Sequence, residues 1–237
     1  MKYPAWLPVT NEASHSFVPS LVGERAVILD LGANMGEFHD AILGRFTPEQ
    51  YIAVEPTPDL AKSLTARGFT VVEAAVAQAT GPVSFAIDAN SEASSIFTGD
   101  GTDDVDGVTY ADLLHRLQLD SVDLVKMDIE GAELFALGDS DDEVLKTARQ
   151  ITVEFHDFNG ILTAHQVHTV VARMRQIGFN AVRFSTNNTD WLFVRRDGIS
   201  TSLWLRVSAM AWLRRSLHRA RWFRRGSVPG AYIFAPK

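Results

Sequence analysis

The chain has 237 residues, of which 46% are hydrophobic and 22% charged, which suits one globular domain with extensions. It contains no cysteine, so disulfides and thiolate metal sites are excluded. The first residues hold one lysine and no continuous apolar run, and no stretch reaches the roughly 18 apolar residues that a membrane span requires. We therefore expect a cytoplasmic protein with neither a signal peptide nor a transmembrane helix.

The net charge of −7 is distributed unevenly along the chain. Residues 198–237 contain eight Lys/Arg and no Asp or Glu, so the remaining 29 acidic and 14 basic residues give residues 1–197 a charge of −15. A basic tail on an acidic body indicates either two surfaces with different partners or a tail packed on its own acidic body. We divide the chain into an N-terminal extension (1–25), a main domain (26–197) and a basic C-terminal extension (198–237).

Segments rich in Val, Ile and Leu alternate with helix-like segments, which predicts an α/β fold with a doubly wound, mostly parallel sheet. The expected strands are residues 26–31, 51–55, 69–76, 122–127 and 150–155, then a closing antiparallel hairpin of 181–185 and 191–196, giving seven strands. Residues 81–90 are expected to form an added β excursion. The expected helices are residues 36–46, one capped by Thr57 and closed by Gly68, 110–117 with a cap at Thr109, and one from Thr163 to Gly178.

A glycine-rich turn follows the first expected strand and contains Gly32, Asn34 and Gly36. In a doubly wound sheet such a turn lies beneath a cofactor, and glycine lets the ligand approach the backbone. The dinucleotide fingerprint would require glycine at Asn34 and Glu37, so a nicotinamide or flavin site is disfavoured. S-adenosylmethionine carries a sulfonium and an amino group instead of a pyrophosphate, and Asp30 is compatible with those positive charges.

Two further positions fit a nucleoside. Glu55 ends the second expected strand, where an acid in this architecture hydrogen-bonds ribose hydroxyls, although it could also be an exposed strand-end residue. Ala74 follows the third strand, where a small side chain leaves room for an adenine ring or serves tight packing.

The fourth expected strand ends in the charged run Lys126-Met127-Asp128-Ile129-Glu130-Gly131-Ala132-Glu133. Charges directly after a core strand indicate a cleft. We expect Asp128 to project toward the donor methyl group. Lys126 could form an internal ion pair with one acid, and Glu133 is expected mainly to begin a helix.

The fifth strand ends in Glu154, Phe155, His156 and Asp157, on the side expected to receive the acceptor. Strand alternation puts Glu154 and His156 on one face. His156 is a candidate base for a hydroxyl, or a histidine satisfied by a neighbouring carboxylate. Asp128, Glu154 and His156 are also candidate ligands of a divalent metal.

With these residues in view, the chain resembles FkbM-type methyltransferases over about residues 26–158. The resemblance rests on four blocks in order, 30–36 (DLGANMG), 54–56 (VEP), 126–133 (KMDIEGAE) and 153–156 (VEFH), and on the serine-containing segment 94–97 (SSIF). It implies a class I, Rossmann-like methyltransferase fold, S-adenosylmethionine as donor, and O-methylation of sugars, glycolipids or secondary metabolites. By position, Gly32, Asn34, Gly36 and Glu55 would hold the donor, with Asp128 near the reacting centre.

The basic tail contains a possible amphipathic helix at residues 212–225, with Trp212, Leu213 and Leu217 on one side and most arginines on the other. Such a helix could lie on an anionic membrane surface, or pack its apolar side on the domain as a lid or dimer helix. The acidic body argues against nucleic acid.

Three functions follow from the sequence. The leading one is methyl transfer to a hydroxyl of a small molecule or glycan, with Asp128, Glu154 and His156 as catalytic candidates. The alternatives are a non-catalytic S-adenosylmethionine-binding module tethered by its tail, and an NAD-linked oxidoreductase.

Overall fold

The structure is a computed structural model that describes residues 4, 6–23, 25–43, 45–46, 48–85, 103–157 and 162–224. Its strands are β1 (Thr10–Glu12), β2 (His15–Phe17), β3 (Val27–Leu31), β4 (Gln50–Val54), β5 (Thr70–Val72), β6 (Ala75–Val76), β7 (Gly81–Phe85), β8 (Asp103–Val108), β9 (Leu124–Met127), β10 (Gln150–Val153), β11 (Phe179–Arg183) and β12 (Trp191–Arg195). Its helices are α1 (Glu37–Leu43), α2 (Pro58–Ala66), α3 (Tyr110–Arg116), α4 (Asp142–Leu145), α5 (Ala164–Gln176) and α6 (Thr201–Arg224). Short turns of helix are η1 (Pro19–Leu21), η2 (Phe135–Asp139) and η3 (Arg196–Gly198).

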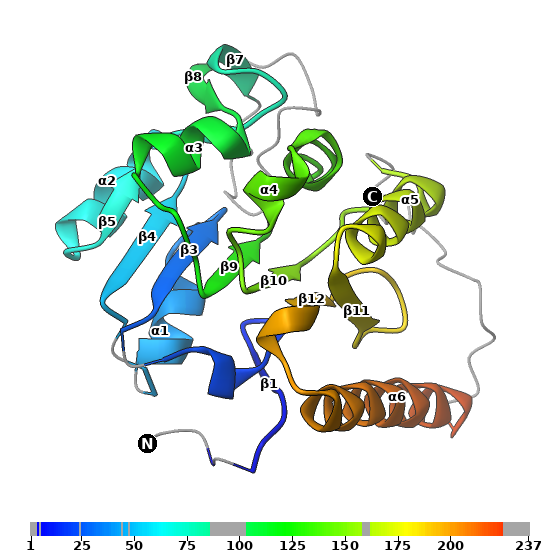
Figure 1. The fold of residues 1–237 in the computed structure, drawn as a ribbon. Coiled ribbons are helices and arrows are strands. Elements are labelled where there is room, and N and C mark those ends of the chain that lie inside the picture. The colour runs from blue at the N-terminus through cyan, green and yellow to red at the C-terminus, as the bar shows by residue number, and fades with distance from the viewer. Residues whose placement is uncertain are drawn as a thin grey trace.

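The centre of the molecule is a mixed sheet of seven strands in the order β11-β12-β10-β9-β3-β4-β5 (Figure 1). Neighbouring strands from β10 to β5 pair in parallel, whereas β12 pairs antiparallel with both β10 and β11. The parallel strands therefore end at one common edge, which is the edge that bears functional sites in sheets of this kind.

Strand alternation divides the core between the two faces of the sheet. Leu29 and Leu31 of β3 pack in the largest apolar cluster, together with side chains of α3, η2, α4 and α5. Ile28 points to the opposite face and packs with Phe38 of α1 and Phe17 of β2. In Figure 1, α3, α4 and α5 accordingly lie on one side of the sheet, and α1, β1 and α6 on the other.

The expected third strand, residues 69–76, is wrong as one element. It is divided into β5, which pairs with β4, and β6, which pairs with β8 in a separate three-stranded sheet with β7. An apolar run does not reveal its pairing partner, and β8 has the acidic sequence DDVDGV, which hides it from a search for hydrophobic strands. Residues 86–90 of the expected excursion lie outside the described residues.

Helix caps were predicted with mixed success. Thr163 forms a reciprocal capping box with Gln166 at the start of α5, and the hydroxyl of Thr109 accepts from the N–H of Asp112 at the start of α3. Thr57 precedes α2 but makes no side-chain cap; its backbone N–H donates to Glu55 instead.

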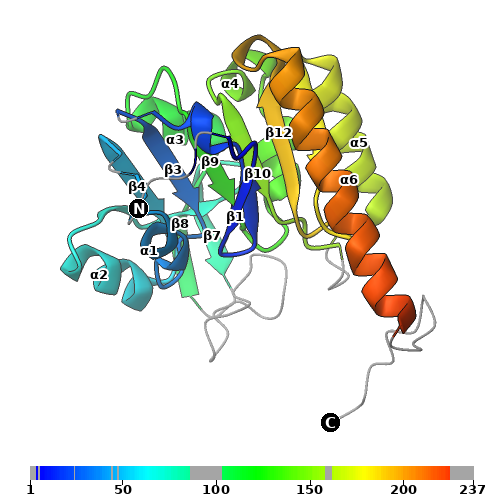
Figure 2. The same ribbon diagram turned by 90° about the horizontal axis from the view of Figure 1, so that it is seen from below.

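Both terminal extensions pack on the sheet. Val9, Val18 and Leu21 of the N-terminal segment share an apolar cluster with Leu192 and Val194 of β12 and with α6. Figure 2 shows α6 running along this side of the molecule in front of β12. Within the described ranges, no helix has the length and hydropathy needed to cross a membrane.

Candidate functional site

The ends of four neighbouring strands bring Gly32, Glu55, Asp128 and Glu154 to the same edge of the sheet. Each of these residues comes directly after the last residue of its strand. At each of them the backbone still forms a hydrogen bond to the neighbouring strand. The N–H of Gly32 donates to Val54 O at 2.9 Å, and that of Glu154 to Met127 O at 3.0 Å. The sequence therefore placed these residues at the edge where they are found.

The turn after β3 depends on glycine. Gly32 has φ +77°, and a Cβ built on it would lie 1.8 Å from the backbone oxygen of Asp128. Gly36 has φ +85°, and its Cβ would approach Leu64 and Arg67 to 3.0 Å. Asn34 between them also adopts a positive φ, of 49°. A side chain at Gly32 would push this turn away from the end of β9.

A buried ion pair supports the turn from below. The Nζ of Lys126 lies 3.2 Å from Asp30 Oδ1 and donates to the carbonyl of Gly32 at 2.5 Å. The hydroxyl of Tyr51 donates to Asp30 Oδ2 at 2.5 Å. Burial alone would lower the pKa of Lys126, but the charges of Asp30 and Asp128 raise it above its usual value, so the lysine stays charged. The expected internal ion pair of Lys126 is confirmed, with Asp30 as its closest acid.

Glu55 joins the two loops that would face a nucleoside. One carboxylate oxygen accepts from the N–H of Asn34 at 2.8 Å, and the other accepts from the N–H of Thr57 at 2.9 Å. The residue is buried, so it is not an exposed strand-end residue. Each oxygen has a second lone pair that can accept another hydrogen bond.

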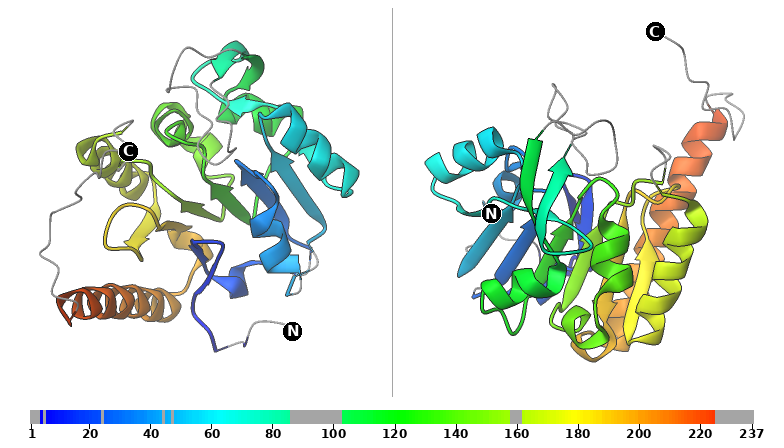
Figure 3. Two further views of the ribbon diagram at one scale, coloured as in Figure 1. Left: turned by 180° about the vertical axis from the view of Figure 1, so that it is seen from behind. Right: turned by 90° about the horizontal axis from the view of Figure 1, so that it is seen from above.

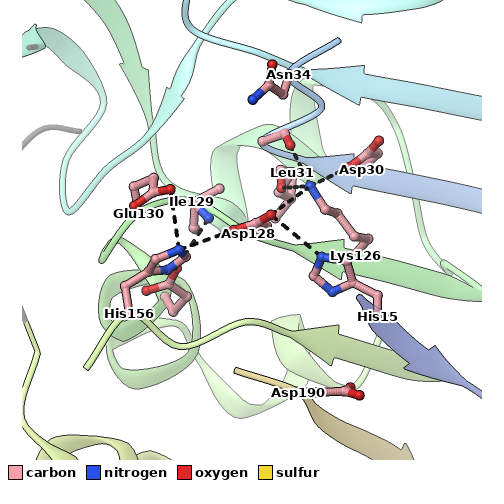
Figure 4. A network of polar contacts seen from close by, with 12 residues as sticks. His15, Asp30, Leu31, Asn34, Lys126, Asp128, Ile129, Glu130, His156 and Asp190 are labelled. Carbon is pink, nitrogen blue, oxygen red and sulfur yellow. Dashed lines mark hydrogen bonds and ion pairs between the residues drawn. The ribbon is translucent and has the colours of Figure 1, made fainter. Parts of the chain in front are cut away.

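Asp128 lies at the centre of a polar network (Figure 4). Its carboxylate is 3.4 Å from His156 Nε2, 3.6 Å from His15 Nε2 and 3.7 Å from Lys126 Nζ. Burial would raise the pKa of Asp128, but the charge of Lys126 and the two histidines hold it well below its usual value. Its side chain is 31% exposed, whereas Asp30 is fully buried, so Asp128 is the one that can face a ligand.

His15 enters this network from the N-terminal hairpin β1–β2. Its side chain is 1% exposed, and it points toward Asp128 from the side of the sheet that β2 covers (Figure 4). The hairpin is held by Asp190, whose carboxylate accepts from the N–H of Ser16 at 3.1 Å and from its hydroxyl at 2.8 Å. Arg214 of α6 contacts the same pair of residues.

His156 is enclosed by carboxylates. Its Nδ1 lies 2.8 Å from Glu133 Oε1, and its Nε2 lies 3.4 Å from Glu130 Oε1 as well as from Asp128. Burial alone would lower the pKa of His156, but the hydrogen bonds to Glu130 and Glu133 raise it to about 11. The imidazole is therefore protonated at neutral pH. Glu130 has φ +50°, an uncommon backbone conformation for a side chain of this size.

Glu154, unlike His156, is surrounded mainly by groups that favour its neutral form. Burial, together with the charges of Asp128 and Glu130, raises the pKa of Glu154 to about 7. A half-buried carboxylate with such a pKa can take up a proton near neutral pH and release it again.

The sequence that forms this edge matches a known protein family. Residues 30–181, more than half of the chain, match the family model described as Methyltransferase FkbM domain. This chain belongs to the FkbM methyltransferase family. No curated protein matches its sequence.

Several solved structures are similar to this FkbM-family chain. One is methyltransferase FkbM from Methylobacillus flagellatus KT, with 16% identity and a TM-score of 0.51 over 72% of this chain and 44% of that chain. This protein thus aligns with less than half the length of that relative. Others are an rRNA methylase from Streptococcus thermophilus (9% identity, TM-score 0.45, 74% and 90% coverage) and Aeropyrum pernix fibrillarin with natively bound S-adenosyl-L-methionine (10%, 0.41, 74% and 67%). The similarity to the first structure shows that this chain has the class I methyltransferase fold, in keeping with its mixed sheet of seven strands.

Three sequence-based assignments of the FkbM-family protein need correction. His156 is not a free base, because Glu133 holds its Nδ1 and the surrounding acids keep it protonated. Asp30 is completely buried against Lys126 and Tyr51, so it supports the glycine turn from below and does not present its carboxylate to a ligand. Ala74 is buried in the largest apolar cluster, which is the tight-packing alternative.

The predicted metal triad is arranged differently in this FkbM-family chain. Among the described residues, two groups of side chains could each hold an ion: His15, Asp128 and Glu154, and Asp128, Glu130 and His156. Asp128 belongs to both groups, whereas Glu154 and His156 are in different ones. The serine-containing segment 94–97 lies outside the described residues.

Sequence reasoning missed His15 and the role of Glu133. His15 lies outside the matched region, and its hairpin turns at Ala13 and Ser14, both with positive φ, without the Asn-Gly or Asp-Gly pair that marks such turns. Glu133 begins a helical turn, as expected, and it is also fully buried against His156, which the sequence did not indicate.

Proposed function

We propose that this FkbM-family methyltransferase uses S-adenosylmethionine to methylate a hydroxyl group. The donor site consists of the glycine turn, Asn34 and Glu55. Three features support the fit. Gly32 and Gly36 keep the turn free of side chains, Glu55 retains lone pairs for ribose hydroxyls, and Asp128 presents a negative charge for a cationic ligand. When bound, S-adenosylmethionine supplies an electrophilic methyl group on a sulfonium cation.

The observation that carries the proposal is the contrast between three titratable groups at one strand edge. Asp128 is held ionised, His156 is held protonated, and Glu154 has a pKa of about 7. Such separation of pKa values among neighbouring groups marks acid–base assignments. Glu154 is therefore the proposed general base.

In this mechanism Glu154 accepts the proton of the acceptor hydroxyl while the hydroxyl oxygen forms its new bond to the methyl carbon; the bond from that carbon to the sulfonium sulfur would break, and S-adenosylhomocysteine would leave. Asp128 stays ionised and favours positive charge beside it. His156 is a positioning residue, because its contacts with Asp128 and Glu130 fix the loop after β9. His15 fixes Asp128 from the other side. Alignment of the two reactants contributes a large share of the rate enhancement in such transfers.

The family resemblance supports a choice of acceptor class. We propose a hydroxyl of a sugar, a glycolipid or a secondary metabolite. The many carboxylates at this edge suit a neutral or cationic region of the acceptor near the reacting oxygen.

A divalent cation held by His15, Asp128 and Glu154 would give these residues different roles, as ligands that lower the pKa of the acceptor. The proposed mechanism needs no such ion, because Lys126, His15 and His156 already surround Asp128. Turnover after dialysis against EDTA distinguishes the two. Unchanged turnover supports Glu154 as base, and loss restored by Mg²⁺ contradicts it.

The function is tested by following S-adenosylhomocysteine formation from S-adenosylmethionine with a panel of hydroxylated glycans, glycolipids and small phenols. Acceptor-dependent formation supports the proposal. Binding of S-adenosylhomocysteine without turnover on any of these acceptors would instead favour the non-catalytic binding module.

A further inference from the structure

The exposed apolar side chains of the described residues gather on one surface. Eight large hydrophobic residues are exposed, and six of them lie on α6 or next to it: Trp6, Leu205, Met210, Trp212, Leu213 and Leu217. Trp6, Leu205 and Trp212 are 69%, 63% and 65% exposed. We call these six residues the apolar strip. A strip of this kind on one helix marks an interaction surface.

The strip faces away from the protein. Val207 and Ala211 form the side of α6 that packs on the sheet, and both are fully buried. Arg214 and Arg215 lie on or beside that side; Arg214 contacts Ser16, and Arg215 donates to the carbonyl of Arg183. The helix therefore packs on the domain through Val207 and Ala211, and the expectation that the side bearing Trp212, Leu213 and Leu217 would do so is wrong.

Trp6 extends the strip beyond the helix. Its backbone carbonyl accepts a hydrogen bond from the guanidinium of Arg206, which holds the N-terminal segment beside α6. Two segments from opposite ends of the chain thus contribute to one surface, and both expose tryptophan, a residue that favours the boundary between apolar and polar surroundings.

The charge around the strip is positive. Residues 198–237 have eight Lys/Arg and no acid. Arg206 and Arg219 are exposed on α6, whereas Arg215 is half-buried against Arg183 on the packed side, where burial and mutual repulsion lower the pKa values of both arginines. Such a concentration of cations favours an anionic partner.

The strip lies near the functional edge of the sheet. Arg215 contacts Arg183, the last residue of β11, and Arg214 contacts the Asp190–Ser16 pair next to His15. Figures 2 and 3 show the final turns of α6 extending past the strands. A partner bound to the C-terminal half of α6 would therefore lie close to the edge of the sheet where the acceptor is proposed to bind.

We propose that the apolar strip binds the surface of an anionic lipid bilayer, with α6 lying in the interface. Insertion of the apolar side chains removes them from water, and the arginines meet the lipid phosphates. A second copy of this chain fits less well, because pairing two α6 helices would bring two acid-free basic segments together. This inference does not depend on the identity of the methyl acceptor.

The test is co-sedimentation of the full chain with vesicles of phosphatidylcholine alone and of phosphatidylcholine mixed with phosphatidylglycerol. The triple variant Trp212→Ser, Leu213→Ser, Leu217→Ser removes part of the strip, and Leu43→Ser, an exposed leucine on α1, is the matched control. Arg219→Glu changes an exposed cation on α6 and leaves the strip intact. Circular dichroism of each variant verifies that the fold is retained.

We expect the wild type and the Leu43 variant to partition onto anionic vesicles, at least roughly tenfold more than onto neutral ones, and less at high salt. The triple variant should lose this binding, and Arg219→Glu should weaken it. No binding to either vesicle, or equal binding of the triple variant, would overturn the proposal. A wild-type dimer that the triple variant converts to a monomer would assign the strip to a second copy and would also overturn it.

Discussion

At the scale of single residues, the protein assigns opposite protonation states to neighbouring groups. The sequence indicated that Asp128, Glu154 and His156 share one edge, and they do. The sequence could not indicate the charge states of these three side chains. Those states depend on contacts with Glu133, which precedes η2, and with His15 of the N-terminal hairpin. A pKa depends on the final surroundings of a group, so residue identity alone does not determine it.

Glu154→Gln should lower kcat by about 10²- to 10⁴-fold, because the amide cannot accept the proton. For the wild type, kcat/KM should fall as the pH drops below about 7, since the base must be deprotonated and its pKa is about 7. Initial rates across the pH range check this. Glu143→Gln, at an exposed carboxylate that contacts Lys146, is the control and should keep the wild-type profile. A Glu154→Gln enzyme with wild-type rates would remove Glu154 from the mechanism.

His156→Gln should destabilise the fold by about 3–5 kcal/mol, because it leaves the buried carboxylate of Glu133 without its charged partner. The folded-state pKa of His156 is raised to about 11 from an ordinary 6.5. Its contribution is therefore complete below pH 6.5 and is lost as the pH rises through about 11. Urea unfolding at several pH values should show the gap between wild type and variant narrowing toward alkaline pH. A gap that widens would contradict the assigned charge state.

At the scale of elements, the strands and helices of the main sheet were largely predictable, because buried parallel strands read as apolar runs and caps have local signatures. The divided third strand and the N-terminal hairpin were not. The partner of β6 is the acidic β8, and the hairpin turns through Ala13 and Ser14, so neither carries the usual local signal. Long-range pairing decides both.

Gly32→Ala should abolish donor binding, because its Cβ would overlap the backbone oxygen of Asp128 at the end of β9. Gly68→Ala is a matched control, since Gly68 also has a positive φ but a Cβ added there would meet no atom within 4 Å. The control should cost about 1–2 kcal/mol of stability and leave S-adenosylhomocysteine binding unchanged. If both variants lost binding equally, the cause would be backbone strain at a positive φ and not the overlap of the Gly32 Cβ with the Asp128 oxygen.

Asp190→Ala should release the N-terminal hairpin, since it removes the two hydrogen bonds to Ser16. We expect a stability loss of about 1–3 kcal/mol and faster amide exchange in β1 and β2. Turnover should fall because His15 no longer fixes Asp128. Asp197→Ala, which removes an exposed ion pair with Arg195, should change neither. Unaltered exchange in the hairpin would mean that Asp190 is not its anchor.

At the scale of the whole molecule, residues outside the region matched by the family contribute both to the candidate site and to the surface. The match covers residues 30–181, but His15 comes from before it, and α6 with its apolar strip comes from after it. The sequence showed the charge asymmetry of the tail, yet the direction of its apolar face became clear only from the packing of Val207 and Ala211.

We propose that the edge formed by β3, β4, β9 and β10 binds S-adenosylmethionine. Calorimetric titration of the full chain with S-adenosylhomocysteine, with NAD titrated in parallel, tests it most directly. We predict micromolar binding of S-adenosylhomocysteine and none of NAD, since Asn34 and Glu37 replace the glycines of a dinucleotide site. Absence of S-adenosylhomocysteine binding, or a preference for NAD, would mean that the glycine turn and the residues around it do not form this site.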